Sequence, residues 1–148
     1  YSCYGDPFMD TLLLLLNGRM NEFTGLDLIP TYSYWRFYET GDDLKYHKDR
    51  ESCEISTTIP LGYDYSNLEN SDYSWPIWVE NNKKEKIQAP LRPGDLLVYR
   101  GCDLAHWRDE FKGLHQAQVF CHYNNKNGPY NNVNDGRPGL GIPKNWRK

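Results

Sequence analysis

Residues 31 to 38 read TYSYWRFY, and this stretch sets the class of fold. Tyr32, Tyr34, Arg36 and Tyr38 occupy every second position in it. Successive side chains of an extended chain point to opposite faces, so the alternation predicts a β-strand with two distinct faces. Aromatic residues also favour half-buried pleated surfaces. We therefore expect the protein to be built around a β-sheet.

Extended segments continue after this strand. In the stretch CEISTTIPL, Ile55, Thr57 and Ile59 are expected to share one face of a strand, with Ser56 and Thr58 on the other. The full set of predicted strands is Thr31–Tyr38, Leu44–Asp49, Cys53–Leu61, Trp75–Glu80, Leu96–Arg100 and Gln116–Tyr123, with a lysine-rich hairpin turn at Asn81–Lys86.

One helix is predicted before the strands. Asp6 as N-cap and Pro7 in the first turn mark its start, and it runs to about Phe23 before Gly25 ends it. Leucines cover most of its circumference, so we expect it to be strongly buried behind a sheet. One helix and at least six strands predict a mainly β fold with a supporting N-terminal helix, of the sandwich or jelly-roll type.

Length and composition limit the classes of function. A chain of 148 residues fits a single domain spanning residues 1–148. The aromatic fraction of 15% favours a sheet-rich protein with a well-lined cavity. A net charge of -3 without a basic block argues against a nucleic-acid partner.

The cysteines and the apolar runs bear on location. The 4 cysteines include no CxxC pair, which favours reduced thiols in a soluble, cytoplasmic protein. The apolar run Leu12–Leu16 is too short for a membrane span and follows no basic segment, so we expect no membrane association. The chain begins at Tyr1 without an initiator methionine, so a few N-terminal residues are expected to be missing. The oligomeric state stays open.

The triplet His47-Lys48-Asp49 is the main chemical signal. Residues two apart in a strand point to the same face, so an imidazole and a carboxylate can meet at one point. A distant histidine, His106, can complete a three-ligand face that leaves other positions open. Two histidines and one carboxylate arranged in this way suit catalytic non-haem Fe(II).

Two other histidines compete for roles at this site. His106, which follows a strand and precedes a turn marked by Gly113, and His115 are the two candidates for the third ligand. His122 lies beside Tyr123 on the last predicted strand, and we interpret it as structural.

These residues resemble the Fe(II)- and 2-oxoglutarate-dependent oxygenases, in particular the prolyl 4-hydroxylase-like branch. The similarity covers two segments, 34–61 and 93–123. The strings DRESCEIS and YRGCDLAHWRD also resemble small proteins of marine-phage type in this branch. The residues that match are Tyr38, Gly41, Leu44, the His47-Lys48-Asp49 triplet, Pro93-Gly94-Asp95-Leu96-Leu97-Val98-Tyr99, His106, Gly113 and the strand Gln116–Tyr123.

The resemblance implies a double-stranded β-helix, or jelly roll, forming one catalytic domain. Fe(II) would be held by His47, Asp49 and His106, and 2-oxoglutarate and O2 would be consumed, with ascorbate as reductant. An aspartate at position 49 argues against halogenation, since related halogenases need a small residue there. The resemblance also implies four cosubstrate-binding residues, Tyr38, Thr58, Arg100 and His115.

One departure from the family pattern concerns the far carboxylate of 2-oxoglutarate. The family places an arginine or lysine about nine residues after the distal histidine, and this chain has His115 there. A protonated His115 would do the same task, although the ordinary pKa of histidine, about 6.5, makes it a weaker choice than arginine. Arg100 is the second candidate.

The resemblance implies hydroxylation of an unactivated C–H bond, with a prolyl residue in a peptide or protein as the expected substrate. Trp107 and Arg108 are candidate substrate-binding residues. The segments expected to grip the substrate, or to close over it, are the loop Gly62–Ser74 and the tail after Asn124. The alternatives are a free amino acid or other small molecule as substrate, a zinc hydrolase using the same ligands, and a non-enzymatic jelly-roll metal-binding module. The zinc alternative lacks an HExxH motif.

Overall fold

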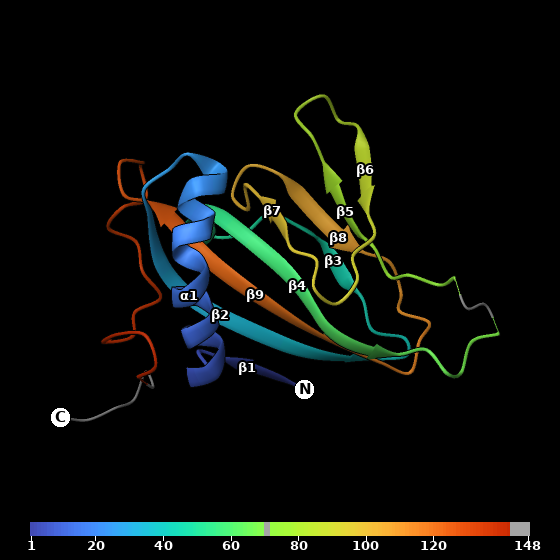
Figure 1. The fold of residues 1–148 in the computed structure, drawn as a ribbon. Coiled ribbons are helices and arrows are strands. Elements are labelled where there is room, and N and C mark those ends of the chain that lie inside the picture. Colours follow the sequence, from blue (N-terminus) through green and yellow to red (C-terminus); the bar gives the residue numbers. More distant parts are fainter. Residues whose placement is uncertain (70–71, 143–148) are drawn as a thin grey trace.

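Two antiparallel sheets face each other in the computed structural model, which describes residues 1–69 and 72–142 (Figure 1). A helix lies outside one of them. The elements are β1 (Ser2–Tyr4), α1 (Pro7–Thr24), β2 (Leu28–Glu39), β3 (Leu44–His47), the short 3-10 helix η1 (Glu51–Cys53), β4 (Ile55–Asp64), β5 (Ile77–Glu80), β6 (Lys86–Ala89), β7 (Leu97–Tyr99), β8 (Ala105–Arg108) and β9 (His115–Asn125).

The strand order defines the fold. The five-stranded sheet has the order β1-β2-β9-β4-β7, and the four-stranded sheet has the order β3-β8-β5-β6. From β2 onward the chain passes back and forth between the sheets, with β2, β4, β7 and β9 in one and β3, β5, β6 and β8 in the other. This is the strand arrangement of a double-stranded β-helix, and the predicted fold class is confirmed.

Both ends of α1 agree with the sequence prediction. The carboxylate of Asp6 accepts hydrogen bonds from the backbone N–H groups of Phe8 and Met9 at 2.9 and 3.3 Å. Gly25 ends the helix in the left-handed region at φ 70, where glycine carries no Cβ penalty. Its N–H donates to the carbonyl oxygen of Asn21.

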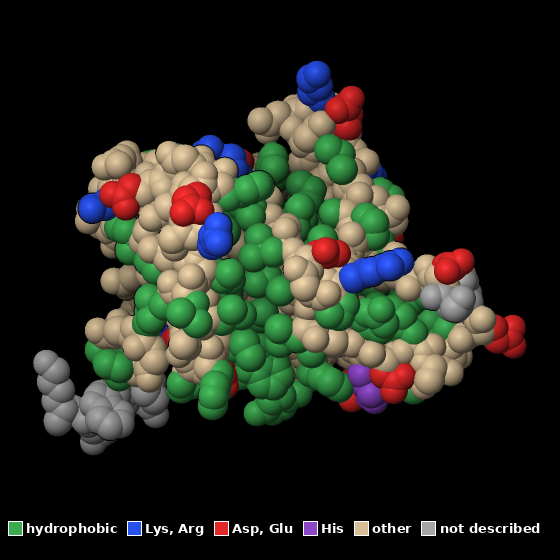
Figure 2. Space-filling view, viewed as in Figure 1, with side chains coloured by type: hydrophobic (Ala, Val, Ile, Leu, Met, Phe, Trp, Pro, Cys, Tyr) green, Lys and Arg blue, Asp and Glu red, His purple; other side chains and the backbone are tan. Residues whose placement is uncertain are grey.

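The prediction that α1 is strongly buried is wrong. Leu13 and Met20 pack onto the five-stranded sheet against Leu28 and Val119, but the opposite side of the helix is open. Leu15 there is 75% exposed. A helix on the outer face of a sheet buries one stripe, and no described segment covers its other side. Hydrophobic side chains form a band on this face of the molecule in Figure 2. None of the described helices is long and apolar enough to cross a membrane.

The inner strand β4 has the two faces expected from its sequence. Ile55 and Ile59 belong to the cluster between the five-stranded sheet and α1. Ser56 and Thr58 point the other way, where Ser56 contacts Asp49 and Thr58 contacts Gln118. One face of this sheet therefore supports the helix, and the other lines the space between the sheets.

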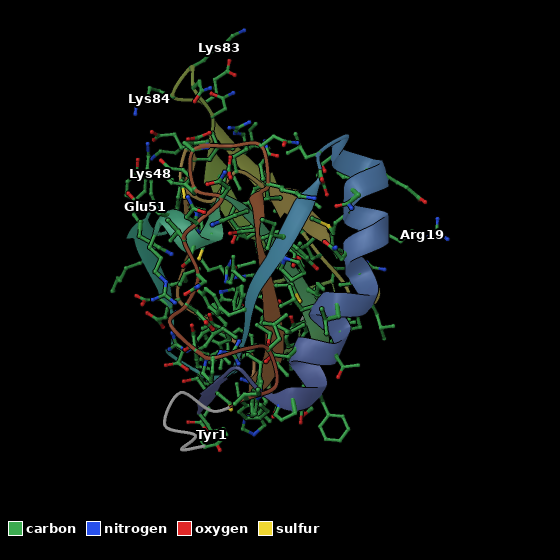
Figure 3. All side chains as sticks on the ribbon, turned by 90° about the vertical axis from the view of Figure 1, so that its left-hand side faces the viewer. Tyr1, Arg19, Lys48, Glu51, Lys83 and Lys84 are labelled. Atoms are coloured by element: carbon green, nitrogen blue, oxygen red, sulfur yellow. The ribbon has the colours of Figure 1, made fainter. Side chains whose placement is uncertain are left out.

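The lysine-rich segment forms the predicted hairpin. β5 and β6 pair in antiparallel register from Ile77↔Ala89 to Glu80↔Lys86. Lys83 and Lys84 project from the tip of this hairpin in Figure 3. The hairpin extends the four-stranded sheet beyond β8.

The C-terminal segment is irregular, as expected, and an ion pair fastens it to α1. Nη1 of Arg137 lies 2.7 Å from Oδ2 of Asp10, and both side chains are 2% exposed. Ser33 donates a further hydrogen bond to Asp10. Part of the loop expected to contact substrate, residues 70–71, and the end of the tail, residues 143–148, lie outside the described residues.

Candidate metal centre and cosubstrate cavity

Two histidines are brought together by strand pairing. His47 and His106 are direct partners in the antiparallel pair of β3 and β8. Their ring centroids are 4.3 Å apart. The register of this pair shifts between Leu44 and His47, and a bulge of this kind re-aims side chains. As a result both Leu44 and His47 line the cavity between the sheets.

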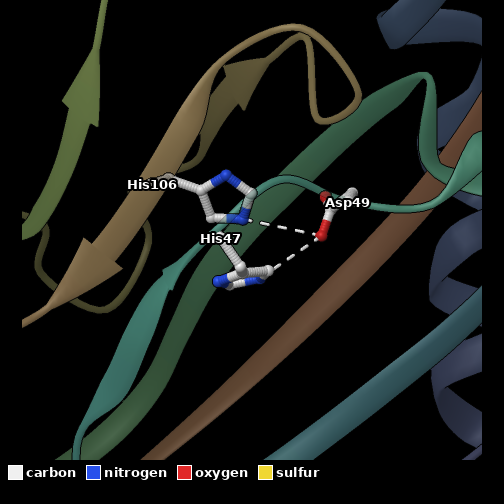
Figure 4. Close-up of side chains that lie close together, drawn as sticks. All are labelled: His47, Asp49 and His106. Carbon is white, nitrogen blue, oxygen red and sulfur yellow. Dashed lines mark ion pairs between the residues drawn. The ribbon is translucent and has the colours of Figure 1, made fainter.

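Asp49 completes the group from just beyond the end of β3. Its backbone N–H donates to the carbonyl oxygen of Gly101 at 2.9 Å, which holds the chain in place after the strand. Its Oδ1 lies 3.6 Å from Nε2 of His47 and 3.5 Å from Nε2 of His106. Figure 4 marks both ion pairs with dashed lines. Lys48, between the two ligand candidates in sequence, is exposed, and Figure 3 shows it at the edge of the molecule.

The backbone fixes which ring nitrogens face the aspartate. Nδ1 of His47 lies 2.6 Å from the carbonyl oxygen of Lys45, and Nδ1 of His106 lies 3.0 Å from that of Leu104. A carbonyl oxygen only accepts, so each Nδ1 carries the proton in the neutral ring and each Nε2 keeps its lone pair. Both Nε2 atoms are therefore ready to bind a cation beside Asp49.

The Asp49 carboxylate and the His47 imidazole influence each other's pKa values. Burial alone would raise the pKa of the Asp49 carboxyl, but the adjacent imidazoles of His106 and His47 hold that pKa far below its ordinary value. The adjacent Asp49 carboxylate also raises the pKa of His47. The carboxylate is thus ionised, and two imidazole nitrogens and one carboxylate oxygen lie within 4.8 Å of one another. This donor set suits Fe(II).

A second layer of hydrogen bonds orients the carboxylate. The hydroxyl of Ser56 donates to Oδ2 of Asp49 at 2.7 Å, and Nδ1 of His122 lies 2.9 Å from the same hydroxyl oxygen. Burial lowers the pKa of His122 to about 4, so this ring is neutral and its Nδ1–H donates to Ser56. Cys53 is also near Asp49, but burial raises the pKa of its thiol to about 11. His122 thus supports Asp49, and the protonated Cys53 is no ready metal ligand.

Gly101 is required by the close approach of Asp49. A Cβ at this position would lie 2.4 Å from Oδ2 of Asp49 and 2.5 Å from Oγ of Ser56. Real Cβ atoms do not come this close to other heavy atoms, so any side chain at position 101 would displace the carboxylate or its supporting hydroxyl.

The ligand candidates open into a cavity of about 210 Å³ between the sheets. Its walls are largely aromatic, which favours exclusion of water. The His106 side chain is 2% exposed, whereas that of His47 is 38% exposed, so the site is closed on the side of β8 and open on the side of β3. The other cavity-lining residues are Tyr32, Tyr34, Arg36, Tyr38, Tyr99, Phe120 and His122.

Of the four residues expected to bind 2-oxoglutarate, two lie between the sheets and two lie at the surface. Tyr38 lines the cavity, and Thr58 is buried on the inner face of β4. Arg100 is 60% exposed and pairs with Asp103 at the surface. His115 is exposed at the start of β9, where its ring packs on Phe37, and it does not line the cavity around the metal ligands. Neither Arg100 nor His115 is brought to the metal site.

Trp107 and Arg108, the two residues expected at the substrate mouth, lie on opposite faces of β8. Trp107 points out of the barrel and stacks on Trp78 with centroids 5.9 Å apart. Arg108 shares the inner face with His106 and is 1% exposed. The structure therefore places neither of them at the open side of the cavity.

Arg108 is a buried cation with an unsatisfied donor. Its Nη1 donates to the carbonyl oxygen of Trp75 and its Nη2 to Oγ1 of Thr58 at 3.4 Å, but its Nε has no partner among the described residues. The Nε2 of Gln118 also has none, while its Oε1 accepts a hydrogen bond from Thr58. A buried donor without a partner costs about 1–3 kcal/mol, and more when it is charged.

Sequence reasoning missed three supporting residues and the orientation of a fourth. Ser56 and Gly101 act through Asp49, and no local pattern links positions 49, 56 and 101. Gln118 lies within the predicted strand Gln116–Tyr123, and no role was predicted for it. The inward direction of Arg108 was predictable, because a residue two positions after an inward-facing His106 in a strand faces inward too.

Comparisons with known proteins bear on the fold. No protein-family model matches the sequence, and the search of curated proteins gives no match. Among solved structures, the fold is similar to an oxidoreductase of the 2OG-Fe(II) oxygenase family from Burkholderia pseudomallei, with a TM-score of 0.64 and 16% identity. That likeness covers 78% of this chain and 56% of the other.

Two further solved structures have similar TM-scores and sequence identities. A Pseudomonas putida prolyl-4-hydroxylase gives a TM-score of 0.62 at 16% identity, covering 83% of this chain and 67% of that one. EctD from S. alaskensis, solved with 2-oxoglutarate and 5-hydroxyectoine, gives a TM-score of 0.62 at 14% identity. The likeness covers 95% of this chain and 63% of the EctD chain. At these identities the likeness establishes the jelly-roll fold. This chain spans little more than half of the Burkholderia protein.

Proposed function

We propose that this protein is an Fe(II)- and 2-oxoglutarate-dependent dioxygenase that hydroxylates an unactivated C–H bond. The observation that carries the proposal is the meeting of His47, Asp49 and His106 on one inner face of a double-stranded β-helix. The residues fit the metal, because both Nδ1 atoms are held by backbone carbonyls and both Nε2 atoms face an ionised carboxylate. Within the described residues, the donors of Arg108 and Gln118 that lack partners suit an organic anion between the sheets.

The chemistry of the bound groups follows from their class. With Fe(II) bound, O2 oxidises 2-oxoglutarate to succinate and carbon dioxide, and one oxygen atom is inserted into a C–H bond of the substrate. The protein residues hold and orient the reactants. His47, Asp49 and His106 would hold the iron, Ser56 would fix the rotamer of Asp49, and the aromatic walls would keep water out. Ascorbate is part of the proposal as the reductant that keeps the iron in its Fe(II) state.

A prolyl residue in a peptide or protein is the proposed substrate. The sequence resemblance to the prolyl 4-hydroxylase-like branch supports it, and so does the fold shared with a bacterial prolyl-4-hydroxylase. The cavity opens beside His47, where an extended peptide can approach. A free amino acid or another small molecule is the second candidate, since a protein of similar fold is recorded with 5-hydroxyectoine. We place this activity in one catalytic domain and inside the cell, where iron stays reduced.

The test is succinate formation from 2-oxoglutarate under air, with Fe(II) and ascorbate. The proposal expects turnover by the wild type and none by Asp49→Ala, with Asp27→Ala, a change in a surface ion pair, as the matched control. Mass spectrometry of proline-containing peptides and of free amino acids would report a gain of one oxygen atom and name the substrate class. A wild type that binds Fe(II) but neither binds nor oxidises 2-oxoglutarate would contradict the proposal and favour a metal-binding module.

A further inference from the structure

The outer side of α1 is an apolar stripe that no described segment covers. Phe8 is 83% exposed, Leu15 is 75% exposed and Phe23 is 77% exposed. They are seven and eight positions apart, so they lie on one side of the helix. Figure 2 shows a band of hydrophobic side chains on this face of the molecule. Since the other side of α1 packs on the five-stranded sheet, this helix carries apolar residues on both sides, which is typical of a helix that is covered on both sides.

A groove of about 480 Å³ runs beside the C-terminal half of α1. Phe23 lines it from the helix, and Leu96 and Val98 line it from the edge of the five-stranded sheet, where β7 lies. Arg19 and Glu22 also line the groove, and both side chains are largely exposed. An apolar groove with a charged rim can receive an aromatic side chain from a partner.

The stripe and the groove are complementary to a second copy of the same face. Phe8, Leu12 and Leu15 follow one another at intervals of four and three, the spacing of a seam between helices that cross at about 20°. A two-fold axis beside Leu15 would make the two helices antiparallel. Phe8 of each chain would then lie near Phe23 of the partner subunit, and so at the groove that Phe23 lines.

The size of the stripe suits a stable dimer. A standard interface buries about 800 Å² per partner, and about 65% of that area is apolar in homodimers, which is about 500 Å². A fully covered aromatic side chain buries about 150–250 Å², and a leucine about 100 Å². With their exposed fractions, Phe8, Leu14, Leu15 and Phe23 offer about 450 Å² per chain. The stripe therefore supplies most of the apolar area that a dimer needs.

The charges on this face also favour a second copy. Arg19 and Glu22 are the only charged side chains on the outer side of α1, and they pair with each other at 3.4 Å. Figure 3 shows Arg19 projecting from the helix. The stripe thus has no net charge, and two copies do not repel one another. A helix that binds a membrane surface carries several basic residues on its polar face, and this helix has one, already paired.

We propose that the outer face of α1 pairs in antiparallel orientation with the same face of a second copy, with Phe8 of each chain in the groove beside Phe23 of the partner subunit. This two-fold dimer goes beyond the proposed function and does not depend on it. The metal-ligand candidates lie between the sheets, on the other side of the five-stranded sheet from α1, so each chain keeps its own open cavity.

Sedimentation equilibrium of the full chain, from about 1 to about 100 μM, tests the dimer. The wild type is expected to shift from monomer to dimer over this range. Leu15→Glu and Phe8→Glu are expected to weaken the dimer at least ~100-fold, because each places a charge in the apolar seam. Glutamate is a good helix former and both positions are exposed, so α1 should stay folded, as circular dichroism would verify. Ile87→Glu, at an exposed apolar position on β6, is the matched control and should keep the dimer.

Cross-linking tests the antiparallel arrangement. Leu15→Cys lies beside the two-fold axis, so its thiols should meet closely enough to form an intermolecular disulfide under mild oxidation. Phe8→Cys lies far from the axis and should give no more cross-linked dimer than the wild type, whose own cysteines set the background. The opposite cross-linking pattern would overturn the arrangement.

A wild type that stays monomeric up to about 100 μM, or a dimer that Leu15→Glu leaves unchanged, would overturn the inference. So would a monomer that binds phosphatidylserine vesicles and loses that binding in Leu15→Glu, which would assign the stripe to a membrane surface.

Discussion

The hydroxyl of Ser56 donates to Oδ2 of Asp49 at 2.7 Å, which leaves Oδ1 of the same carboxylate facing both histidines. One oxygen atom of Asp49 is thus used to hold the side chain, and the other is directed at the metal position. Partners of this kind fix ligand orientation and tune metal affinity.

Replacing Ser56 by alanine is expected to weaken Fe(II) binding about 10- to 100-fold, because Asp49 loses the donor that fixes its rotamer. Anaerobic titration with Fe(II) measures this directly. Ser2→Ala, at an exposed position, serves as the control. If Ser56→Ala bound Fe(II) as tightly as the wild type, the supporting role of this hydroxyl would be wrong.

Gly101→Ala is expected to lower Fe(II) affinity by at least ~10-fold, because its Cβ would collide with the oxygens of Asp49 and Ser56. Overpacking of this kind also costs about 1–3 kcal/mol of stability, so a urea unfolding curve should accompany the metal titration. Gly62→Ala is the matched control, since a Cβ at that position meets no atom within 4 Å. Equal metal affinities for the two variants would show that the space at position 101 is not limiting.

His115→Ala is expected to leave 2-oxoglutarate affinity unchanged, within about a factor of two, because this ring lies against Phe37 outside the cavity. Calorimetric titration of the Fe(II)-loaded variant is the measurement. A loss of binding of ~30-fold or more would instead give the anchoring role to His115.

The buried pair of Asp10 and Arg137 is expected to stabilise the attachment of the C-terminal segment. Burial alone would raise the pKa of Asp10, but hydrogen bonds from Arg137, Ser33 and Gly141 bring that pKa below its ordinary value of 3.8. A lowered native pKa means that the contribution is complete above pH 3.8 and is lost as the pH falls through the native pKa.

Asp10→Asn should therefore destabilise the protein by about 3–5 kcal/mol at pH 7, since it leaves Arg137 buried without its full counter-charge. Urea unfolding at pH 7 and at lower pH values is the test, and the difference from the wild type should shrink once the pH falls below 3.8. Asp27→Asn removes an exposed pair with Lys126 and should change stability by less than about 1 kcal/mol. A pH-independent difference for Asp10→Asn would contradict the electrostatic explanation.

The sequence predicted the long elements well, because their patterns are local. The alternation in TYSYWRFY lies within β2, and Asp6 and Gly25 bound α1 as expected. The short strands β1, β6 and β8 were not among the predicted strands. Ala105–Arg108 alternates apolar and polar residues over only 4 residues, too short a run to identify a strand, and its extended form depends on pairing with β3 and β5, as in Trp78↔Trp107.

The candidate site was predictable only where its geometry is local. His47 and Asp49 are two residues apart, so their shared face followed from strand alternation. The pairing of His47 with His106 depends on the register of β3 and β8, which the sequence alone does not give. Arg108 was predicted to bind substrate, and only the packing between the sheets shows that it is buried.

The most direct test of the account is an equilibrium titration with Fe(II) under anaerobic conditions, on the wild type and on His47→Ala, Asp49→Ala and His106→Ala. The account predicts one Fe(II) per chain in the wild type and affinities at least ~100-fold weaker in each variant, since each removes one of three ligands. Circular dichroism of each variant would verify that the fold is kept. Stoichiometric Fe(II) binding that survives all three substitutions, or no binding by the wild type, would contradict the account.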